Sequence, residues 1–485
     1  MAAVYVPRSP TTGVLYGVVS THLSELLTAV DAQTDGGSLP EVVVGEFRKF
    51  LRCGVLAHGF ARVRCGDCAF ERLVPFSCRG RAVCPSCGGR RMAERAAHLV
   101  DHVLPADVPV RQWVLSVPHR LRYRLAYDHR LCRTVLYVFV RALRSAYRRQ
   151  ARRYGLAGGE TGMVTSVQRF GGAVNVHLHF HTLVLDGVFV REPDGTLRFH
   201  PTAPPTDDDV RRVVARVRRR LERLGLAGAT IGDEDADPLA EESAALASLS
   251  RAAILGRAAL GQRAGRGPER VGADPDAPWV ERHVPLHAHE AGFDLHAAVH
   301  VAAGDRKRLE RLCQYLCRPP LGQGRLQRLR DGRIAVALQR PWADGTTHLV
   351  FTPVELLERL VPLVPRPRTN LILYHGVLAP NAPWRREVVA RAESEASAVE
   401  PCPRSPPADE ERAEAKPDRA RPKYRAWADL MRRAFEADVL SCPRCGGRMT
   451  VLATIEDPAV IQRILTHLGL SVEAGGALPA TRGSP

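Results

Sequence analysis

The stretch between residues 174 and 185 most constrains what this chain can fold into. From Val174 to His181, apolar and polar residues alternate strictly, which is the two-residue period of a half-buried β-strand. The apolar side chains therefore lie on one face of the strand, and the polar side chains lie on the other. The polar face carries three histidines, which are His177, His179 and His181. We expect Asp186 and Gly187 to close a tight hairpin after this strand.

The histidine-bearing face has two interpretations. It is either an exposed strand that happens to contain several histidines, or a metal site. Neutral imidazole is the commonest protein ligand for metal ions, and a strand holds ligands with little slack. We favour the metal site, because the histidines alternate and an apolar opposite face fixes the strand against a core.

The chain carries a large positive charge. It has 69 lysines and arginines against 52 acidic residues, which gives a net charge of +17 and a pI near 9.8. Such an excess suits a polyanionic partner such as DNA, and the predominance of arginine over lysine favours phosphate binding. No apolar run of about 18 residues predicts a membrane span. The N-terminal sequence lacks the form of a signal peptide, so we expect a cytoplasmic protein whose paired cysteines bind metal.

Two CxxC pairs predict a zinc-binding domain in the N-terminal part of the chain. Each pair lets a short turn direct two thiolates at one ion, and four thiolates complete a structural, tetrahedral Zn²⁺ site. The predicted ligands are Cys65, Cys68, Cys84 and Cys87. Four buried free thiols would not explain the paired spacing. Three further residues lie nearby and can support a second ion or replace one ligand; these are Cys53, His58 and Cys78.

A third CxxC pair, Cys442 and Cys445, lies close to the C-terminus. Taken alone, this pair has two interpretations. It is half of a second zinc site whose partners are not evident from the sequence, or it is a tight turn with two idle thiols.

Several arginines are candidates for DNA binding. Four of them surround the N-terminal cysteine pairs, where we expect contacts to DNA phosphate. These are Arg79, Arg81, Arg90 and Arg91. Two more, Arg148 and Arg149, lie at the basic end of a long helix predicted at residues 128–154. That end is either a solvated basic face or a contact for the DNA backbone.

The order of the predicted elements indicates an α+β fold with a ferredoxin-like sheet, because it reads βαββαβ. The histidine strand is the third strand of this unit. The other elements are a strand at 110–118, the helix at 128–154, and then a strand at 161–170, a basic helix at 207–225, a strand at 293–301 and a helix at 305–318.

Tyr315 departs from the amphipathic pattern of the helix predicted at 305–318. The apolar stripe of that helix consists of Leu309, Leu312, Cys313 and Leu316. Tyr315 falls roughly 110° from the centre of the stripe, in line with Arg308 and Arg311. An aromatic hydroxyl beside guanidinium groups suits attack on a phosphodiester, because the arginines orient the phosphate. The alternative is an ordinary amphipathic tyrosine at the margin of the core; the histidine strand favours the nucleophile.

A strand with the pattern His-hydrophobic-His, together with a tyrosine on a separate helix, resembles the HUH single-strand endonucleases. The resemblance narrows to insertion-sequence transposases of the IS91 type, and it spans about residues 45–470. The stretches that carry it, in order along the chain, are LRCGVLAHGFARVRCGDCAF, FSCRGRAVCPSCGGRR, HLHFHTLVLDGVF, LERLCQYLCRPPL, YHGVLAPNAPWR and VLSCPRCGGRM.

The resemblance implies roles for individual residues. His179 and His181 match the two histidines that bind a catalytic Mg²⁺ or Mn²⁺ ion, with His177 as an additional histidine on the same face. Tyr315 matches the nucleophile, which forms a 5′-phosphotyrosine and frees a 3′-OH. Many members carry a second tyrosine four residues away, a position occupied here by arginine or proline, so the chain resembles the single-tyrosine branch of common-region elements. The third metal ligand stays open among His177, Asp294, His296 and Gln314.

The function implied is that of a transposase that cuts and rejoins single-stranded DNA at the ends of an insertion element, by rolling-circle transposition. Three alternatives remain. One is a zinc-dependent DNA-binding regulator without catalysis, which would have no use for Tyr315. Another is a metallohydrolase that uses all three histidines, and the last is a relaxase or replication initiator.

We divide the chain into five parts on this basis. They are N-terminal helices with the zinc-binding domain at 1–105, a catalytic domain at 106–325 with an insertion at about 226–292, a β-rich extension at 326–389, a flexible linker at 390–423, and a C-terminal helical module with a CxxC pair at 424–485.

Overall fold

The centre of the protein is a six-stranded antiparallel sheet with the strand order β10-β11-β4-β6-β5-β15. The computed structural model describes residues 3–4, 9–34, 37–226, 237–277, 284–396, 427–435 and 437–472. In the order of the sheet, the strands are β10 (His287–Glu290), β11 (Phe293–Val301), β4 (Val110–Ser116), β6 (Val176–Leu185), β5 (Gly162–Phe170) and β15 (Ile372–Gly376).

The four inner strands confirm the predicted ferredoxin-like fold. Along the chain they follow the order β4, α5, β5, β6, α6, β11, whereas in space β6 lies between β4 and β5, and β11 flanks β4. This is the order that a split βαβ unit requires. The edge strands were not predicted: β10 forms a hairpin with β11, and β15 pairs with β5.

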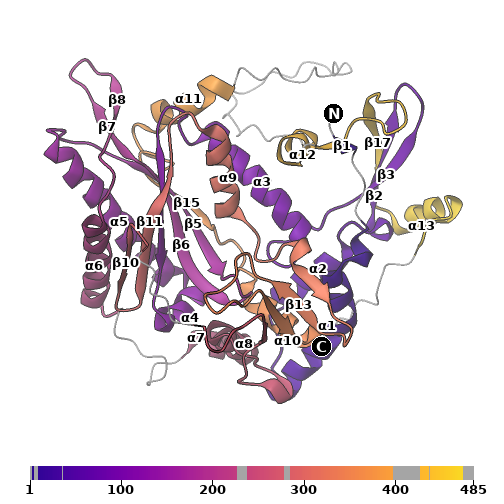
Figure 1. Ribbon diagram of the computed structural model, residues 1–485. Helices are drawn as coiled ribbons and strands as arrows, with labels where there is room; N and C mark the ends of the chain where they lie inside the picture. Colours follow the sequence, from indigo (N-terminus) through magenta and orange to yellow (C-terminus); the bar gives the residue numbers. More distant parts are fainter. Residues whose placement is uncertain are drawn as a thin grey trace.

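Helices cover both faces of this sheet (Figure 1). On one face, α5 (His129–Arg153) and α6 (Asp207–Arg223) form a core with apolar residues such as Phe180. On the other face, α3 (Pro85–His102) and α9 (Arg306–Cys317) form a core with residues such as Leu183. Because side chains alternate along a strand, the histidines of β6 share the face of Leu183 and lie on the side of α9.

A second core joins the N-terminal helices to parts of the chain far from them in sequence. Here α1 (Val14–Gln33) and α2 (Glu41–Arg52) pack with α8 (Ala244–Leu255) and α10 (Pro353–Leu360). The predicted insertion is thus integrated into this core. The short helices α4 (His119–Tyr127) and α7 (Pro238–Glu242) lie at its border.

A four-stranded sheet borders the second core. Within the predicted β-rich extension, β13 (Ile334–Ala337) pairs with β14 (His348–Phe351) as an antiparallel hairpin. Its outer strands are β12 (Leu326–Arg328) and, from the insertion, β9 (Glu269–Val271). The β-rich extension therefore takes one strand from the insertion.

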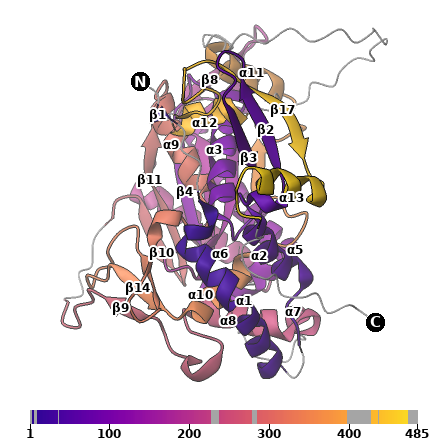
Figure 2. The ribbon, with the colours of Figure 1, turned by 90° about the vertical axis from the view of Figure 1, so that its right-hand side faces the viewer.

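The C-terminal elements fold back onto the N-terminal part of the chain. β17 (Met449–Ile455) pairs with β2 (Phe60–Cys65), which also pairs with β3 (Glu71–Pro75), and Figure 2 shows these three strands side by side. The helices of this region are α12 (Trp427–Phe435) and α13 (Pro458–His467). The linker predicted at 390–423 overlaps α11 (Arg385–Ala396), and the rest of it lies outside the described residues.

The hairpin predicted at Asp186 and Gly187 is wrong. Strand β6 has β4 and β5 as its neighbours, whereas β7 (Gly187–Arg191) pairs with β8 (Leu197–Pro201). Asp186 is instead buried in an ion pair with Arg111, with Nη2 and Oδ2 2.8 Å apart. Gly187 is required for close packing, because a Cβ there would lie 2.3 Å from the carbonyl oxygen of His200.

Among the described helices, none combines the length and the apolar character that a membrane span requires.

Candidate functional site

A cavity of about 1220 Å³ opens between the central sheet and the second core. Its floor is the histidine face of β6, and α9 contributes one side. The opposite wall comes from the insertion and from the β13–β14 hairpin, two segments that the packing of the second core brings together. The polar and aromatic residues of that wall include Arg257, Arg270, Arg340 and Trp342.

The three histidines of β6 line this cavity as a ladder of neighbouring rings. The ring centroids of His177 and His179 are 4.9 Å apart, and those of His179 and His181 are 4.8 Å apart. Burial lowers the pKa of His177 to about 3 and the pKa of His179 to about 4, and it lowers the pKa of His181 well below its ordinary value. The rings are therefore neutral at pH 7, which is the form that binds metal ions.

Hydrogen bonds orient two of these rings. Nδ1 of His179 lies 2.8 Å from the carbonyl oxygen of His177, so this nitrogen donates its proton and Nε2 keeps a lone pair. The side-chain amide of Gln112 lies 3.0 Å from Nδ1 of His181. Nε2 of His181 is buried and has no hydrogen-bond partner among the described residues. An unpartnered buried nitrogen on a residue that lines a cavity fits a metal ligand, because leaving it unpaired is otherwise costly.

Tyr315 lines the same cavity and packs against the His181 end of this ladder. Its ring centroid is 5.6 Å from that of His181, with the two ring planes at 86°. As predicted, the tyrosine is off the apolar stripe: its side chain is 44% exposed, whereas all four stripe residues are buried. The guanidinium carbon of Arg318 lies 4.4 Å from the tyrosine ring centroid.

Hydrogen bonds from β5 hold the end of α9 that carries Tyr315 against the sheet. Gln168 donates from Nε2 to the carbonyl oxygens of Tyr315 and Leu316, at 3.2 and 3.0 Å, and Ser166 donates from Oγ to that of Leu316 at 3.0 Å. These bonds satisfy carbonyls that the last turn of a helix leaves unpaired. The β5 side chains therefore fix the height of the tyrosine above β6.

The arginine beside the tyrosine differs from the two that the sequence suggested. Arg308 and Arg311 are exposed and do not line the cavity, whereas Arg318 does. Arg318 stands at the end of α9, three residues after Tyr315, and directly precedes two prolines. The helical spacing that aligns Tyr315 with Arg308 and Arg311 also points forwards to Arg318, because residues three positions apart lie on the same face.

Of the candidates for a third metal ligand other than His177, one lines the cavity and two do not. His296 lines the cavity, whereas Asp294 accepts a hydrogen bond from His287 at 2.7 Å on the edge hairpin. Gln314 does not line the cavity. Within the described ranges, only cysteines bring three or more ligand atoms of His, Cys, Asp or Glu within 4.8 Å of one another. The cavity thus offers the adjacent imidazoles of His177, His179 and His181, to which DNA oxygens and water would have to add ligands.

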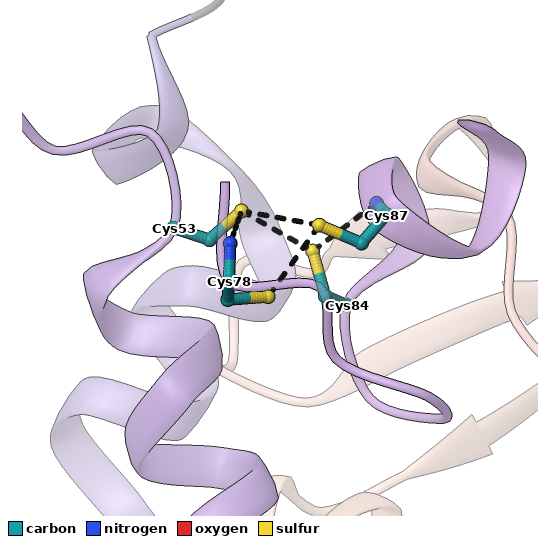
Figure 3. A group of neighbouring side chains, drawn as sticks. All are labelled: Cys53, Cys78, Cys84 and Cys87. Atoms are coloured by element: carbon teal, nitrogen blue, oxygen red, sulfur yellow. Dashed lines mark hydrogen bonds between the residues drawn. The ribbon is translucent and has the colours of Figure 1, made fainter. Parts of the chain in front are cut away.

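The cysteines form two separate clusters, so the predicted grouping of four is wrong. The first, the base cluster, consists of Cys53, Cys78, Cys84 and Cys87 (Figure 3). The second, the tip cluster, consists of Cys65, Cys68, Cys442 and Cys445.

The β2–β3 hairpin explains this division. Cys65 and Cys68 belong to its turn, whereas Cys53 and Cys78 flank its base, where Gly54 N–H donates to the carbonyl oxygen of Phe76 at 2.9 Å. The hairpin therefore separates two CxxC pairs that are close in sequence. His58 belongs to neither cluster.

The base cluster has the geometry of a structural zinc site. Its Sγ–Sγ distances include 3.6 Å for Cys53–Cys87 and 3.5 Å for Cys78–Cys87. Four thiolates placed about 2.3 Å from a tetrahedral ion would be separated by roughly 3.8 Å. The amide of Cys87 also donates to the sulfur of Cys84 at 3.5 Å, which orients that ligand.

Two family models match the chain. Residues 22–117 match the model described as "Transposase zinc-binding domain", and residues 162–386 match the model described as "Putative transposase". The chain belongs to the IS91 family of transposases. The first match contains the whole base cluster and the second contains His179, His181 and Tyr315, so both centres lie in matched regions. No curated protein and no solved structure matches the chain.

Membership of this family makes the protein a DNA-binding transposase with structural Zn²⁺. The arginines predicted to touch DNA take different positions in it. Arg91 donates to the carbonyl oxygen of Arg79 at 2.8 Å, within the zinc-binding region, and Arg81 donates to that of Thr369 at 2.7 Å, which joins this region to the segment before β15. Arg90 is half-buried on α3, and Arg79 is exposed.

The basic end of α5 lies on the face of the sheet opposite the cavity of the transposase. Arg148 is paired there with Glu160, and Arg149 is exposed. Tyr147, between the arginines of this end, is buried and donates to Asp186 at 2.8 Å. This end of α5 is therefore partly occupied by contacts within the protein.

Proposed function

We propose that this transposase cuts and rejoins single-stranded DNA at element ends through a covalent bond between Tyr315 and a 5′-phosphate. The observation that carries the proposal is the position of the tyrosine ring, which packs against the ring of His181 with the centroids 5.6 Å apart on the lining of one cavity. A phosphate bound in the cavity beside the two rings would lie near both the hydroxyl group and the imidazole face.

The reaction is a transesterification in two steps. The hydroxyl oxygen of Tyr315 attacks the phosphorus, the bond to the 3′-oxygen breaks, the phenolic proton is lost to solvent, and the leaving oxygen becomes a 3′-OH. In the second step a 3′-OH attacks the phosphotyrosine, and the tyrosine oxygen leaves and regains a proton. The bond energy is stored in the covalent intermediate, so joining needs no ATP.

The residues of the cavity have separate tasks in this proposal. His179 and His181 hold a Mg²⁺ or Mn²⁺ ion, with Gln112 orienting the second ring. When bound, such an ion withdraws charge from the non-bridging oxygens of the phosphate. Arg318 replaces Arg308 and Arg311 as the residue that steadies the phosphate, because its guanidinium group is the one that lines the cavity beside Tyr315.

The wall opposite the histidines supports a single strand as the substrate. Trp342 lies on it with the guanidinium carbon of Arg270 5.0 Å from its ring centroid, and Arg257 and Arg340 lie beside them. Unpaired bases stack on aromatic side chains, and arginines follow the phosphates of a single strand. Base-paired DNA hides its base faces and would not use such a wall.

Single-turnover incubation with an oligonucleotide of the element end separates the alternatives. The proposal predicts a denaturation-resistant protein–DNA adduct that requires Mg²⁺ or Mn²⁺. The rate of adduct formation should fall by roughly a hundredfold or more in His179→Ala and in His181→Ala. Nicked DNA without an adduct would instead indicate a metallohydrolase. Binding without cleavage in any metal would indicate a regulator.

A further inference from the structure

The tip cluster joins two parts of the chain that are 374 residues apart. Cys65 and Cys68 come from the turn of the β2–β3 hairpin, and Cys442 and Cys445 come from the turn before β17. The sulfurs of Cys65 and Cys445 are 3.5 Å apart, and those of Cys68 and Cys442 are 3.6 Å apart. All four sulfurs lie within 4.8 Å of one another.

These distances discriminate between the ways of using four cysteines. A disulfide requires sulfurs about 2.05 Å apart, whereas tetrahedral zinc places them at roughly 3.8 Å. The amide of Gly447 donates to the sulfur of Cys445 at 3.4 Å, which orients that ligand. A Cβ at Gly447 would lie 1.9 Å from Oδ2 of Asp67, so a side chain there would require the exposed Asp67 carboxylate to move. The two turns thus lie against each other around the sulfurs.

We propose that one Zn²⁺ ion docks the C-terminal module, residues 427–472, onto the N-terminal hairpin. The ligands are Cys65, Cys68, Cys442 and Cys445. The apolar cluster around the sulfurs is small: among the described residues its buried members, besides two of the cysteines, are Val63 and Met449. The ladder between β17 and β2 and the packing of α13 on Phe60 also hold the module. A metal ion would add a cross-link at the end of this contact where the apolar core is smallest.

The docked module reaches the helix that carries the tyrosine. Arg433 of α12 donates from Nε and Nη2 to the carboxylate of Glu310 on α9, with distances of 2.9 to 3.1 Å. Its Nη1 also donates to Asp101 of α3 at 2.7 Å. A forked, charge-assisted contact of this kind fixes geometry as well as adding energy. The zinc ion therefore acts on the active site through Arg433, which is a positioning residue for α9; this part rests on the proposed function.

Zinc content measures the docking site independently of any DNA chemistry. By native mass spectrometry, the full-length chain is expected to bind two zinc ions, one for each cluster. The double variants Cys442→Ser/Cys445→Ser and Cys65→Ser/Cys68→Ser are each expected to bind one. The control Cys132→Ser, which alters a cysteine outside both clusters, should keep both ions. A Cys442→Ser/Cys445→Ser chain with unchanged zinc content would overturn the proposal.

A conservative variant distinguishes a ligand from a packing residue. Cys445 is exposed, so Cys445→His can present a nitrogen ligand and should restore the ion that Cys445→Ser loses. If histidine fails while the variant remains folded by circular dichroism, Cys445 is not a ligand and the shared site is wrong.

The link to α9 has its own measurement. Arg433→Ala should keep both zinc ions and the affinity for single-stranded DNA, yet form the adduct between roughly tenfold and a hundredfold more slowly, because the tyrosine helix loses its support. Glu310→Gln should have a similar effect, and the double variant should add little to either. Unchanged rates would refute the positioning role. A wild-type chain that never forms an adduct would refute the proposed function and leave the zinc site standing.

Discussion

At the scale of single residues, the proposed chemistry depends on how the two sides of the cavity are held. His181 is oriented by Gln112 and keeps an unpartnered buried nitrogen, and Tyr315 is fixed through the carbonyl that accepts from Gln168. The sequence identified the histidines and the tyrosine because strand and helix periodicities place side chains on faces. Gln112 was beyond it, since its role depends on which strands are neighbours, whereas Arg318 could have been found three residues after Tyr315.

Arg318 and Arg308 provide a matched test at this scale. Both are arginines of the tyrosine helix or its end, but only Arg318 lines the cavity. We expect Arg318→Ala to slow adduct formation by roughly a hundredfold, the usual size for loss of a preorganised charge in phosphoryl transfer. Arg308→Ala should change the rate less than threefold or so. Equal losses of rate in the two variants would indicate that the phosphate binds on the exposed face of α9 that carries Arg308.

The buried histidines also predict how stability depends on pH. The pKa of His177 is lowered to about 3 and that of His179 to about 4, so below pH ~6.5 the unfolded chain binds protons that the folded chain does not. The contribution of the two neutral histidines to the free energy of unfolding is complete above pH ~6.5 and is lost as the pH falls towards 4. In magnesium-free buffer, His177→Asn should flatten this decline by up to about 1.4 kcal/mol per pH unit. Urea unfolding at several pH values measures it, and an unchanged slope would show that desolvation does not lower the pKa of His177.

At the scale of elements, the periodic segments of the chain were predictable and their partners were not. The strands at 110–118, 161–170 and 293–301 and the long helices occur close to their expected bounds. The predicted grouping of the cysteines was wrong, because the β2–β3 hairpin places Cys65 and Cys68 away from the base cluster. The pattern of a CxxC pair reports that a turn can hold a metal, but long-range contacts decide which turns meet.

The contact between α3 and the end of α9 gives a prediction for an element. Gly88 packs on Pro319, and a Cβ at Gly88 would lie 2.6 Å from the proline Cβ, whereas Gly89 has nothing within 4 Å. Because the proline ring cannot yield, Gly88→Ala should lower the free energy of unfolding by about 1–3 kcal/mol and slow adduct formation. The control Gly89→Ala should do neither. Thermal unfolding and single-turnover rates measure both effects, and equal behaviour of the two variants would exclude the close contact.

At the scale of the whole molecule, segments distant in sequence build the two functional centres. The cavity needs the central sheet, the insertion and the β13–β14 hairpin, and the tip cluster needs both ends of the chain. The sequence could supply the charge and the family resemblance, but not this assembly, since no local pattern encodes that β9 joins β14 or that β17 joins β2.

The face used by DNA can be tested with two similar aromatic residues. Trp342 lines the cavity with Arg270 stacked on it, and Tyr137 is exposed on α5, on the other side of the sheet, with Arg141 stacked on it. Trp342→Ala should weaken binding of single-stranded DNA by about 1–3 kcal/mol, and Tyr137→Ala should leave it unchanged. Fluorescence anisotropy at fixed salt measures the difference. Loss of binding only in Tyr137→Ala would place the strand on the α5 face.

The most direct measurement of the central claim is the identity of the residue joined to DNA. An oligonucleotide labelled on the 3′ side of the scissile phosphate should become covalently attached to the protein in Mn²⁺, and peptide mass spectrometry should place the 5′-phosphate on Tyr315. Tyr315→Phe should bind the same DNA and form no adduct. An adduct that persists in Tyr315→Phe, or a phosphate attached to another residue, would contradict the account.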